Sequence, residues 1–437
     1  MTAAARPSLG IDPELQRKIG FTLLALLIYR IGAHIVAPGV NVTALADFIR
    51  NSAAAGFFGL YDTLGGGLSR ATIFALGIMP YISSSIIFQL GGGIVPSIGK
   101  MQKDEEGRKK LTQWTRYLTV LIALSQAWTF TLFTESIPGA IGFPTFWTRL
   151  SMVTVLTTGA VFVMWLGEQI TERGIGNGMS LMITFSILDR LWPGLINMIQ
   201  FLKEGVLTPL RVVLFLAILG GVVAAVTAMT LAARRIPVQI PRKVMGRGRM
   251  TQGQKTFIPI RLITAGVMPI IFAQTIIIVP GTLASLTQNG ILRSLADFFN
   301  PGELPYDLSF AVLIMLLSYF YTSIIINSVD LAENLKKQGG FIPGVKPGGS
   351  TADYIDSVLA RVTLPGAIFL AIVALVPVML TKNLGFQQQF GGTSVLIVVG
   401  VLLDTIAQIQ QHLTLRKYDS FMKSGRIKFR GRQQRYM

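Results

Sequence analysis

Long apolar runs separated by polar, mostly basic loops dominate the pattern of this 437-residue chain. A helix needs roughly 20 apolar residues to cross the ~30 Å hydrocarbon core of a bilayer. Ten stretches reach or approach that length, and they cover residues 19–36, 71–90, 117–133, 152–166, 179–199, 212–231, 262–286, 308–326, 362–380 and 393–407. The pattern predicts an all-α polytopic membrane protein with ten transmembrane helices.

The second and seventh spans contain the same short phrase, G-[IV]-M-P, at residues 77–80 and 266–269. A glycine and a proline this close interrupt a helix, and in a bilayer the freed backbone groups need neighbouring helices or water. If the chain is divided after its fifth span, the two copies cross in opposite directions. We therefore expect two inverted five-helix halves, residues 1–200 and 201–415, and a basic tail, 416–437. A chance match in glycine-rich apolar sequence is the alternative.

The fifth and tenth spans are each interrupted by an acidic residue, Asp189 and Asp404. Because these spans run in opposite directions, we expect Asp189 toward the outside and Asp404 toward the cytoplasm. A charge inside a membrane must face protein or water. Two arrangements stay open: pairing with a nearby polar group, such as Arg190 for Asp189, or exposure to a water-filled vestibule.

Composition supports a membrane protein and argues against several kinds of site. Hydrophobic residues make up 51% of the chain and charged residues only 14%, against roughly 25% in a soluble domain. Cysteine is absent and histidine occurs twice, so we expect no metal or redox-thiol site. A phosphate-binding loop at Gly99-Lys100 would need glycine at Ile94 and Ser or Thr at Met101. We predict no cofactor and no enzyme activity, so driving energy must come from a partner.

Basic residues gather in the loops on the side of the two termini, which predicts cytoplasmic N- and C-termini. The first span follows Arg17 and Lys18 and has the length of a retained anchor rather than a cleaved signal. The loop over residues 232–261 alternates apolar and polar residues, which indicates a protruding hairpin. With a net charge of +18, this face suits anionic lipid or RNA phosphates, although topology alone explains part of the charge.

One further segment, residues 53–68, is too short and too rich in glycine to cross a bilayer. From composition it is either a half-inserted helix or a plain external amphipathic loop.

Four phrases carry a family resemblance: LSRATIFALGIMPYISSSIIFQL (68–90), MWLGEQITERGIGNGMS (164–180), NLKKQGGFIPGVKPG (334–348) and FGGTSVLIVV (390–399). Their sequence and order resemble the SecY family of bacterial protein-translocation channels. The resemblance implies the SecY fold, with two hinged halves around an hourglass pore. It also implies a channel that moves unfolded preproteins across the bacterial plasma membrane and releases transmembrane helices sideways into lipid.

The resemblance also implies functional residues. A ring of apolar side chains closes the pore, and it falls on Ile78, Ile82, Met179, Ile183, Ile271 and Ile397. Met179 stands where isoleucine is expected, and its flexibility suggests a looser seal on that side. Residues 53–68 become the plug, with the apolar side chains Phe57, Phe58, Leu60, Tyr61, Leu64 and Leu68.

A side exit is implied between spans two and three and spans seven and eight, with Gln89 and Gln274 on its two walls. These amides would form a buried pair or face pore water. Loops 232–261 and 328–361 become docking sites for the ribosome and the SecA ATPase, through Arg242, Lys243, Arg247, Arg249, Lys336, Lys337, Lys346 and Arg361. Lys346 replaces the family's usual arginine and loses its bidentate geometry.

Further partners implied by the resemblance are SecE, SecG, signal sequences of preproteins and anionic lipids. The alternative from another class is an ion-coupled secondary transporter, because inverted repeats and broken helices also occur there. Asp404 would then be its coupling carboxylate. The large basic loops and the lack of clustered ionisable residues in the spans disfavour that alternative.

Overall fold

The computed structural model describes residues 13–51, 67–143, 145–205, 207–239, 244–245, 249–250, 255–286, 304–384 and 392–428. Within the first half, the helices are α1 (Pro13–Gly32), α2 (Val42–Asn51), the one-turn η1 (Leu68–Arg70), α4 (Met79–Ile94), α5 (Pro96–Lys103), α6 (Glu105–Glu135), α7 (Phe146–Arg173) and α8 (Gly178–Lys203). The second half contains α9 (Pro209–Leu231), β1 (Ala233–Gln239), β2 (Val244–Met245), β3 (Arg249–Met250), β4 (Lys255–Arg261), α10 (Met268–Leu286), α12 (Leu304–Ile325), α13 (Ser328–Lys337), α14 (Gly349–Leu384) and α15 (Gly392–Lys428).

Each of the ten predicted spans overlaps one long helix, namely α1, α4, α6, α7, α8, α9, α10, α12, α14 or α15. Among the described residues, six helices are long and apolar enough to cross a membrane, or seven if α4 and α5 count as one bent span. The described apolar stretches of α8 and α10, Gly178–Asp189 and Met268–Ile277, are shorter than a full crossing. The all-α, multi-span expectation is confirmed.

The repeated phrase has the same local structure in both halves. Gly77 and Gly266 adopt positive φ angles of 53° and 60°, and α4 and α10 begin two residues later at Met79 and Met268. Proline follows as the second helical residue, where its missing N–H costs nothing. Residues 71–78 and 262–267 form turns, so the expected helical starts at 71 and 262 were wrong. The cause is the glycine, which places the backbone in the left-handed region.

A second feature repeats in the same way. A Cβ atom at Gly159 of α7 would lie 1.9 Å from the Ile73 carbonyl oxygen, and one at Gly366 of α14 would lie 2.5 Å from that of Leu262. Ile73 and Leu262 each precede the glycine of the repeated phrase by four residues. Helix and turn therefore touch backbone to backbone at equivalent places, which rules out a chance match of the phrase.

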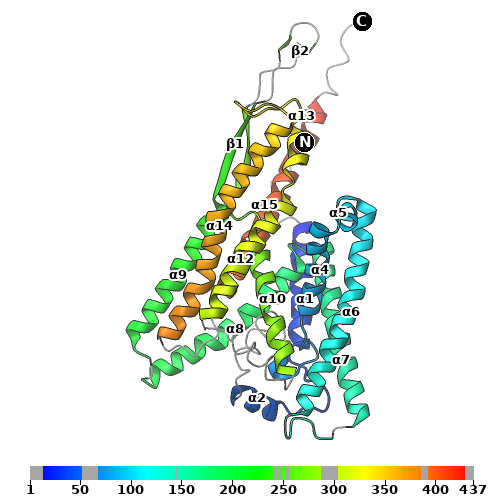
Figure 1. Ribbon diagram of the computed structural model, residues 1–437, viewed down its shortest axis with the longest axis vertical. Coiled ribbons are helices and arrows are strands. Elements are labelled where there is room, and N and C mark those ends of the chain that lie inside the picture. The colour runs from blue at the N-terminus through cyan, green and yellow to red at the C-terminus, as the bar shows by residue number, and fades with distance from the viewer. Residues whose placement is uncertain are drawn as a thin grey trace, which may run out of the picture.

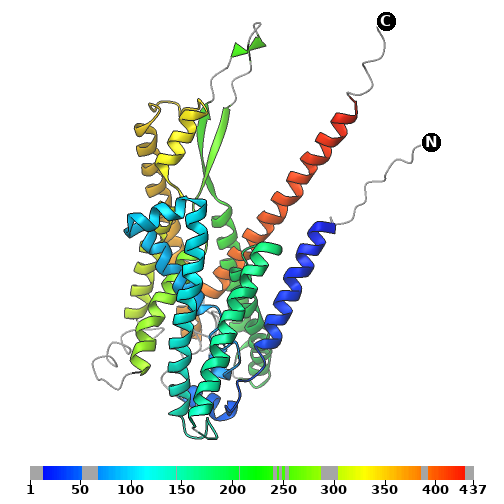
Figure 2. The same ribbon diagram turned by 90° about the vertical axis from the view of Figure 1, so that its right-hand side faces the viewer.

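The two ends of the molecule differ in character (Figures 1 and 2). At one end lie the start of α1, the helices α5 and α13, the β1–β4 hairpin and the end of α15, while α2 and the α8–α9 junction lie at the other. The strands β1 and β4 are antiparallel, with Ala233 opposite Arg261 and Gln239 opposite Lys255. The predicted hairpin is confirmed. Apolar and polar residues alternate along β1 because Ile236 and Val238 are buried in an apolar cluster with Ile342 and Ile355.

The close approach of the glycines predicts a stability difference. Gly159→Ala and Gly366→Ala should each lower the free energy of unfolding by about 1–3 kcal/mol, because the added methyl group meets backbone that cannot rotate away. The measurement is thermal unfolding of the purified protein in detergent. Gly220→Ala in α9, where nothing lies within 4 Å of the added Cβ, is the matched control and should be neutral or slightly stabilising. Equal behaviour of all three variants would contradict the packing argument.

Candidate functional site

Six apolar side chains on or just before four helices belong to the apolar interior at the junction of the two halves. Ile78 is the residue before α4 and Ile82 lies in its first turn, whereas Met179 and Ile183 belong to α8. The second half contributes Ile271 of α10 and Ile397 of α15. The five isoleucines are between 1% and 6% exposed and belong to one buried cluster, against which Met179 packs. Helices α4 and α10 pack together, as do α8 and α15, so the cluster spans both halves.

The repeated phrase positions two of these side chains. Ile82 and Ile271 each lie five residues after the positive-φ glycine, and their N–H groups donate to Ile78 O at 3.0 Å and Val267 O at 3.3 Å. These are backbone bonds within the first turn of each interrupted helix. The interrupted helix of each half therefore carries one isoleucine at the same position relative to its start, and both isoleucines are buried.

Two threonine hydroxyls beside the cluster are satisfied within their own helices. The hydroxyl of Thr184, next to Ile183, donates to Ser180 O at 2.9 Å. That of Thr275, one turn after Ile271, donates to the Ile271 carbonyl at 2.8 Å. These hydroxyls are not turned toward a ligand, so they leave the apolar character of the cluster intact.

Met179 differs from the isoleucines in its surroundings. A Cβ atom at Gly167 of α7 would lie 2.4 Å from the Met179 sulfur, so the missing side chain of Gly167 leaves the space that the thioether fills. Met179 is half-buried, whereas its helical neighbour Ile183 is 2% exposed. The substitution is accommodated by packing inside the first half.

The two glutamines expected on the walls of the side exit have different environments. The Gln89 amide of α4 accepts a hydrogen bond from the Tyr321 hydroxyl of α12 and donates one to Ser85 Oγ at 2.7 Å. Gln274 of α10 is 1% exposed, and its Oε1 has no hydrogen-bond partner among the described residues. Neither expected arrangement describes Gln89, because its partner is a tyrosine that sequence reasoning missed. The sequence feature that could have indicated this partner is the presence of tyrosine in the apolar run 308–326.

Tyr321 lies at the boundary between α4 of the first half and α10 and α12 of the second, which we call the seam. Its ring packs edge-on against Phe272 of α10, with ring centroids 5.2 Å apart, while its hydroxyl reaches α4. The phenol therefore joins α10, α12 and α4 at one point.

Asp189 is paired within the first half. Its carboxylate forms an ion pair with Arg30 of α1, and one turn earlier the Ser186 hydroxyl is 2.9 Å from that of Tyr29. The partner is thus on another helix rather than the neighbouring Arg190, whose side chain lies outside the described set. Asp189 ties α8 to α1.

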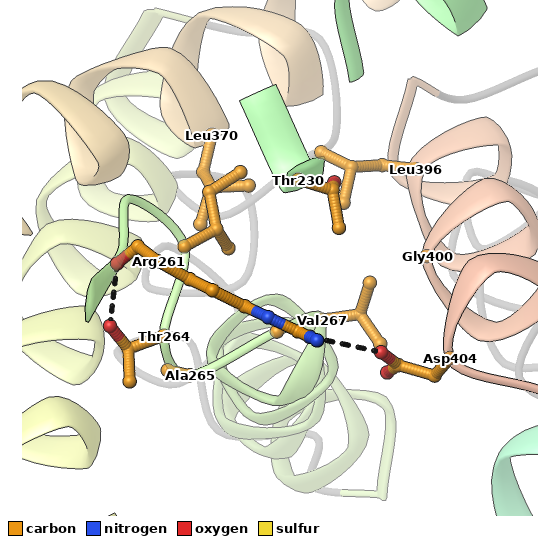
Figure 3. Close-up of a pocket in the computed structure, with 11 residues that line it drawn as sticks. Thr230, Arg261, Thr264, Ala265, Val267, Leu370, Leu396, Gly400 and Asp404 are labelled. Atoms are coloured by element: carbon orange, nitrogen blue, oxygen red, sulfur yellow. Dashed lines mark hydrogen bonds and ion pairs between the residues drawn. The ribbon is translucent and has the colours of Figure 1, made fainter. Parts of the chain in front are cut away.

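Asp404 of α15 lies in a small cavity of about 140 Å³ that Figure 3 shows in close-up. Arg261, the last residue of β4, extends its guanidinium across the cavity to 3.9 Å from the Asp404 carboxylate. Both side chains remain about half exposed. Asp404 therefore has a loose polar partner, as one of the two expected arrangements held, and its exposed part faces this cavity. The pair connects the base of the hairpin to α15.

The predicted docking residues that the structure describes are exposed at the hairpin end. Lys336 and Lys337 close α13, Lys346 lies in the following loop, and Arg361 lies on α14. The loop after α13 is tied to the hairpin, because Gln239 and Phe341 exchange backbone hydrogen bonds of 2.9 Å. The described strand β1 and the loop after α13 therefore lie side by side, although they are far apart in the sequence.

Other predicted site residues lie outside the described residues. They are Arg242, Lys243 and Arg247 in the hairpin and Phe57, Phe58, Leu60, Tyr61 and Leu64 in the plug segment. The backbone of Arg249 opens β3. Leu68, at the end of the plug segment, is buried in the same cluster as the ring isoleucines. Within the described ranges, no three His, Cys, Asp or Glu side chains gather so that they could hold a metal ion.

Comparisons with known proteins agree with this architecture. A model of the SecY family matches residues 72–406. The protein translocase subunit SecY of Aquifex aeolicus is 40% identical over 418 residues, covering 94% of this chain and 97% of that one. The SecY of Escherichia coli K12 is 38% identical, with 98% of both chains covered.

Solved structures show the same fold at lower identity. The structure described as a protein-conducting channel has a TM-score of 0.66 and 17% identity, with 94% of this chain and 95% of that one covered. Sec61 in the canine ribosome-channel complex from the endoplasmic reticulum has a TM-score of 0.62, 18% identity and the same coverage. With the full-length sequence relatives, these similarities show that the chain belongs to the SecY family.

Proposed function

We propose that this chain is the channel subunit of a bacterial Sec translocase, which moves unfolded preproteins across the plasma membrane and releases transmembrane helices into lipid. The observation that carries the proposal is the cluster of six apolar side chains, contributed by two helices of each half. The relatives named protein translocase subunit SecY support it. The channel has no enzymatic activity of its own and takes its driving energy from partners.

The pore ring comprises Ile78, Ile82, Met179, Ile183, Ile271 and Ile397. An apolar constriction expels water and so blocks ions, whereas an extended polypeptide can press its side chains aside. The satisfied hydroxyls of Thr184 and Thr275 support this function, because an unsatisfied hydroxyl there would help water to enter.

Residues 53–68 act as the plug on the outer side of the ring. The attachment of its last residues supports this assignment, because the Gly67 N–H donates to the Ala75 carbonyl oxygen at 3.0 Å. Ala75 is three residues from Ile78. A plug anchored there is held within reach of the ring.

Lateral release takes place between α4 and α6 of the first half and α10 and α12 of the second, with Gln89 and Gln274 on the two walls. The hydrogen bond from Tyr321 to Gln89 holds this seam closed. Interhelical hydrogen bonds in lipid contribute only about 0.6 kcal/mol on average. A hydrogen bond this weak can break when an apolar segment enters between α4 and α12.

The basic end of the molecule faces the cytoplasm, together with both termini, and receives the ribosome and SecA. The hairpin and the 328–361 loop provide the docking surface, where Arg242, Lys243, Arg247, Arg249, Lys336, Lys337, Lys346 and Arg361 meet rRNA phosphates, acidic side chains or anionic lipid. SecE and SecG complete the complex, and signal sequences enter through the seam. The ribosome-bound Sec61 structure of the same fold supports this proposal.

Opening the ring should make the resting channel leak. We expect the triple variant Ile82→Gly, Ile183→Gly and Ile397→Gly to raise ion conductance through membranes without a substrate, because the constriction then wets. The measurement is planar-bilayer conductance of the reconstituted complex. Ile355→Gly, which removes a fully buried isoleucine from the separate cluster under the hairpin, is the control for general destabilisation. Unchanged conductance in the triple variant would rule out the ring.

Charge reversal on the hairpin should weaken ribosome binding. We expect glutamate at four of the basic positions of the hairpin to lower affinity and to flatten its dependence on salt, because fewer counterions are then released. The four positions are Arg242, Lys243, Arg247 and Arg249. Binding is measured over a salt series with the protein in detergent.

The control for the hairpin reverses two exposed residues at the α8–α9 junction, Lys203, which ends α8, and Arg211, in the first turn of α9. Those changes should leave both affinity and salt slope unaltered. If the hairpin variant also behaves like the parent protein, its charges serve membrane topology alone.

The variant Asp404→Asn distinguishes the two proposed functions, a protein-conducting channel and an ion-coupled transporter. In a channel, asparagine keeps the shape of the side chain and loses only a loose, half-exposed pair with Arg261, which contributes at most about 1 kcal/mol. We expect preprotein transport into vesicles, driven by SecA and ATP, at a rate within a few-fold of the parent. Complete loss of transport with normal folding and SecA binding would indicate a coupling role for the carboxylate.

A further inference from the structure

We propose that an ion pair between Lys103 and Asp330 latches the two halves at one end of their seam and sets how apolar a segment must be to leave between them. The inference rests on the proposed function, because it concerns the same seam. Lys103 Nζ lies 3.2 Å from Asp330 Oδ2, across a sequence separation of 227 residues. The pairs Arg116–Glu168 and Arg261–Asp404 each stay within one half, whereas this pair crosses from the first half to the second.

Lys103 is rigidly attached to α4. The helix α5, which Lys103 ends, folds back from α4 with a bend of 107°. Gln102 Nε2 donates to the Phe88 carbonyl of α4 at 3.1 Å, and Arg108 Nε donates to the Gln102 carbonyl at 2.9 Å. A Cβ atom at Gly99 would lie 2.7 Å from the Gly92 carbonyl oxygen, so α5 rests directly on α4. When α4 moves, Lys103 moves with it.

Asp330 is attached to α12 in a comparable way. Two residues separate α12 from α13, and the second of them, Asn327, caps α13 by accepting hydrogen bonds from Val329 N at 3.1 Å and Asp330 N at 3.3 Å. Asp330 lies in the first turn of α13, where the helix dipole also favours a carboxylate. The latch therefore connects the ends of α4 and α12.

The ion pair is the last of three contacts along the seam. The first is the hydrogen bond from Tyr321 to Gln89. One turn further along α4, a Cβ atom at Gly93 would lie 2.8 Å from the ring of Phe320, the residue before Tyr321 on α12, so ring and backbone are in contact. Lys103 and Asp330 follow toward the hairpin end. A segment that leaves between α4 and α12 must part these contacts.

The latch differs physically from the other two contacts. The Lys103 and Asp330 side chains are 65% and 56% exposed, so salt screens their attraction, whereas the apolar contact at Gly93 is insensitive to salt. An exposed pair of this kind biases a closed state by a factor of about two to five. In free energy this bias is similar to the burial of about one methylene group. The ion pair can therefore shift the apolarity at which a segment leaves the channel by about that amount.

The functional test uses Lys103→Gln, Asp330→Asn and the double variant in the complete complex reconstituted in vesicles. Membrane segments of graded leucine and alanine content are scored for lateral release against full translocation. For segments near the parent's midpoint, each single variant should raise the ratio of release to translocation about two- to fivefold. The double variant should match the singles, because the second change removes nothing more.

Salt and a matched control sharpen this test. Raising KCl from about 50 mM to about 500 mM should reproduce the effect in the parent and leave the double variant unchanged. Glu333→Gln removes an exposed carboxylate from the same helix, one whose partner is Lys337 within α13, and should behave like the parent. Additive effects of the two single variants, or an equal effect of Glu333→Gln, would overturn the latch.

A spectroscopic test separates failure of the latch from failure of the proposed function. The chain has no cysteine, so Lys100→Cys and Gln338→Cys place spin labels on the two sides of the seam without background. Lys103→Gln should raise the separated population about two- to fivefold in the distance distribution. An unchanged distribution overturns the latch even in an active channel. If the parent transports nothing but the distribution shifts, the latch stands and the proposed function fails.

Discussion

The rest of this structure depends on one constraint, which is that a helix interrupted inside a membrane must find partners for its freed backbone groups. The protein meets it twice with the same device. A positive-φ glycine and a proline start α4 and α10 late, and the preceding turns lie against glycine backbone of α7 and α14. The Ile73 and Leu262 carbonyls can be approached so closely only because Gly159 and Gly366 carry no side chain. The late starts of α4 and α10 in turn place Ile82 and Ile271 in the first turns of two helices that pack together, inside one buried cluster.

Packing is extensive within each half and sparse between them, which suits two bodies that must separate. Ion pairs such as Arg30–Asp189 and Arg261–Asp404 join elements inside one half. Contacts across the junction include an apolar cluster, a tyrosine hydroxyl on a glutamine amide, the Gly176 N–H on the Gln408 side chain and one exposed ion pair. Each is individually weak or adaptable. A junction of this kind can close against ions and still open for a polypeptide.

The hairpin end combines charge with mechanical connection. The hairpin is anchored by buried Ile236 and Val238, its base reaches α15 through Arg261, and its side is bonded to the loop after α13. A partner that binds this end therefore touches elements continuous with α10, α12 and α15. The same end holds α5 and α13, which lie on the two sides of the seam.

The sequence by itself determined the fold class, the ten helices, the inverted repeat and the hairpin, because hydropathy, the G-[IV]-M-P phrase and strand alternation are local patterns. It also indicated the isoleucines of the central cluster, through a family resemblance. Only the tertiary structure decided which side chains meet across the halves. Tyr321 reaches Gln89, Lys103 reaches Asp330 and Arg30 reaches Asp189 because helices distant in sequence pack side by side. No local pattern records such pairs, since each partner is an ordinary residue in its own segment.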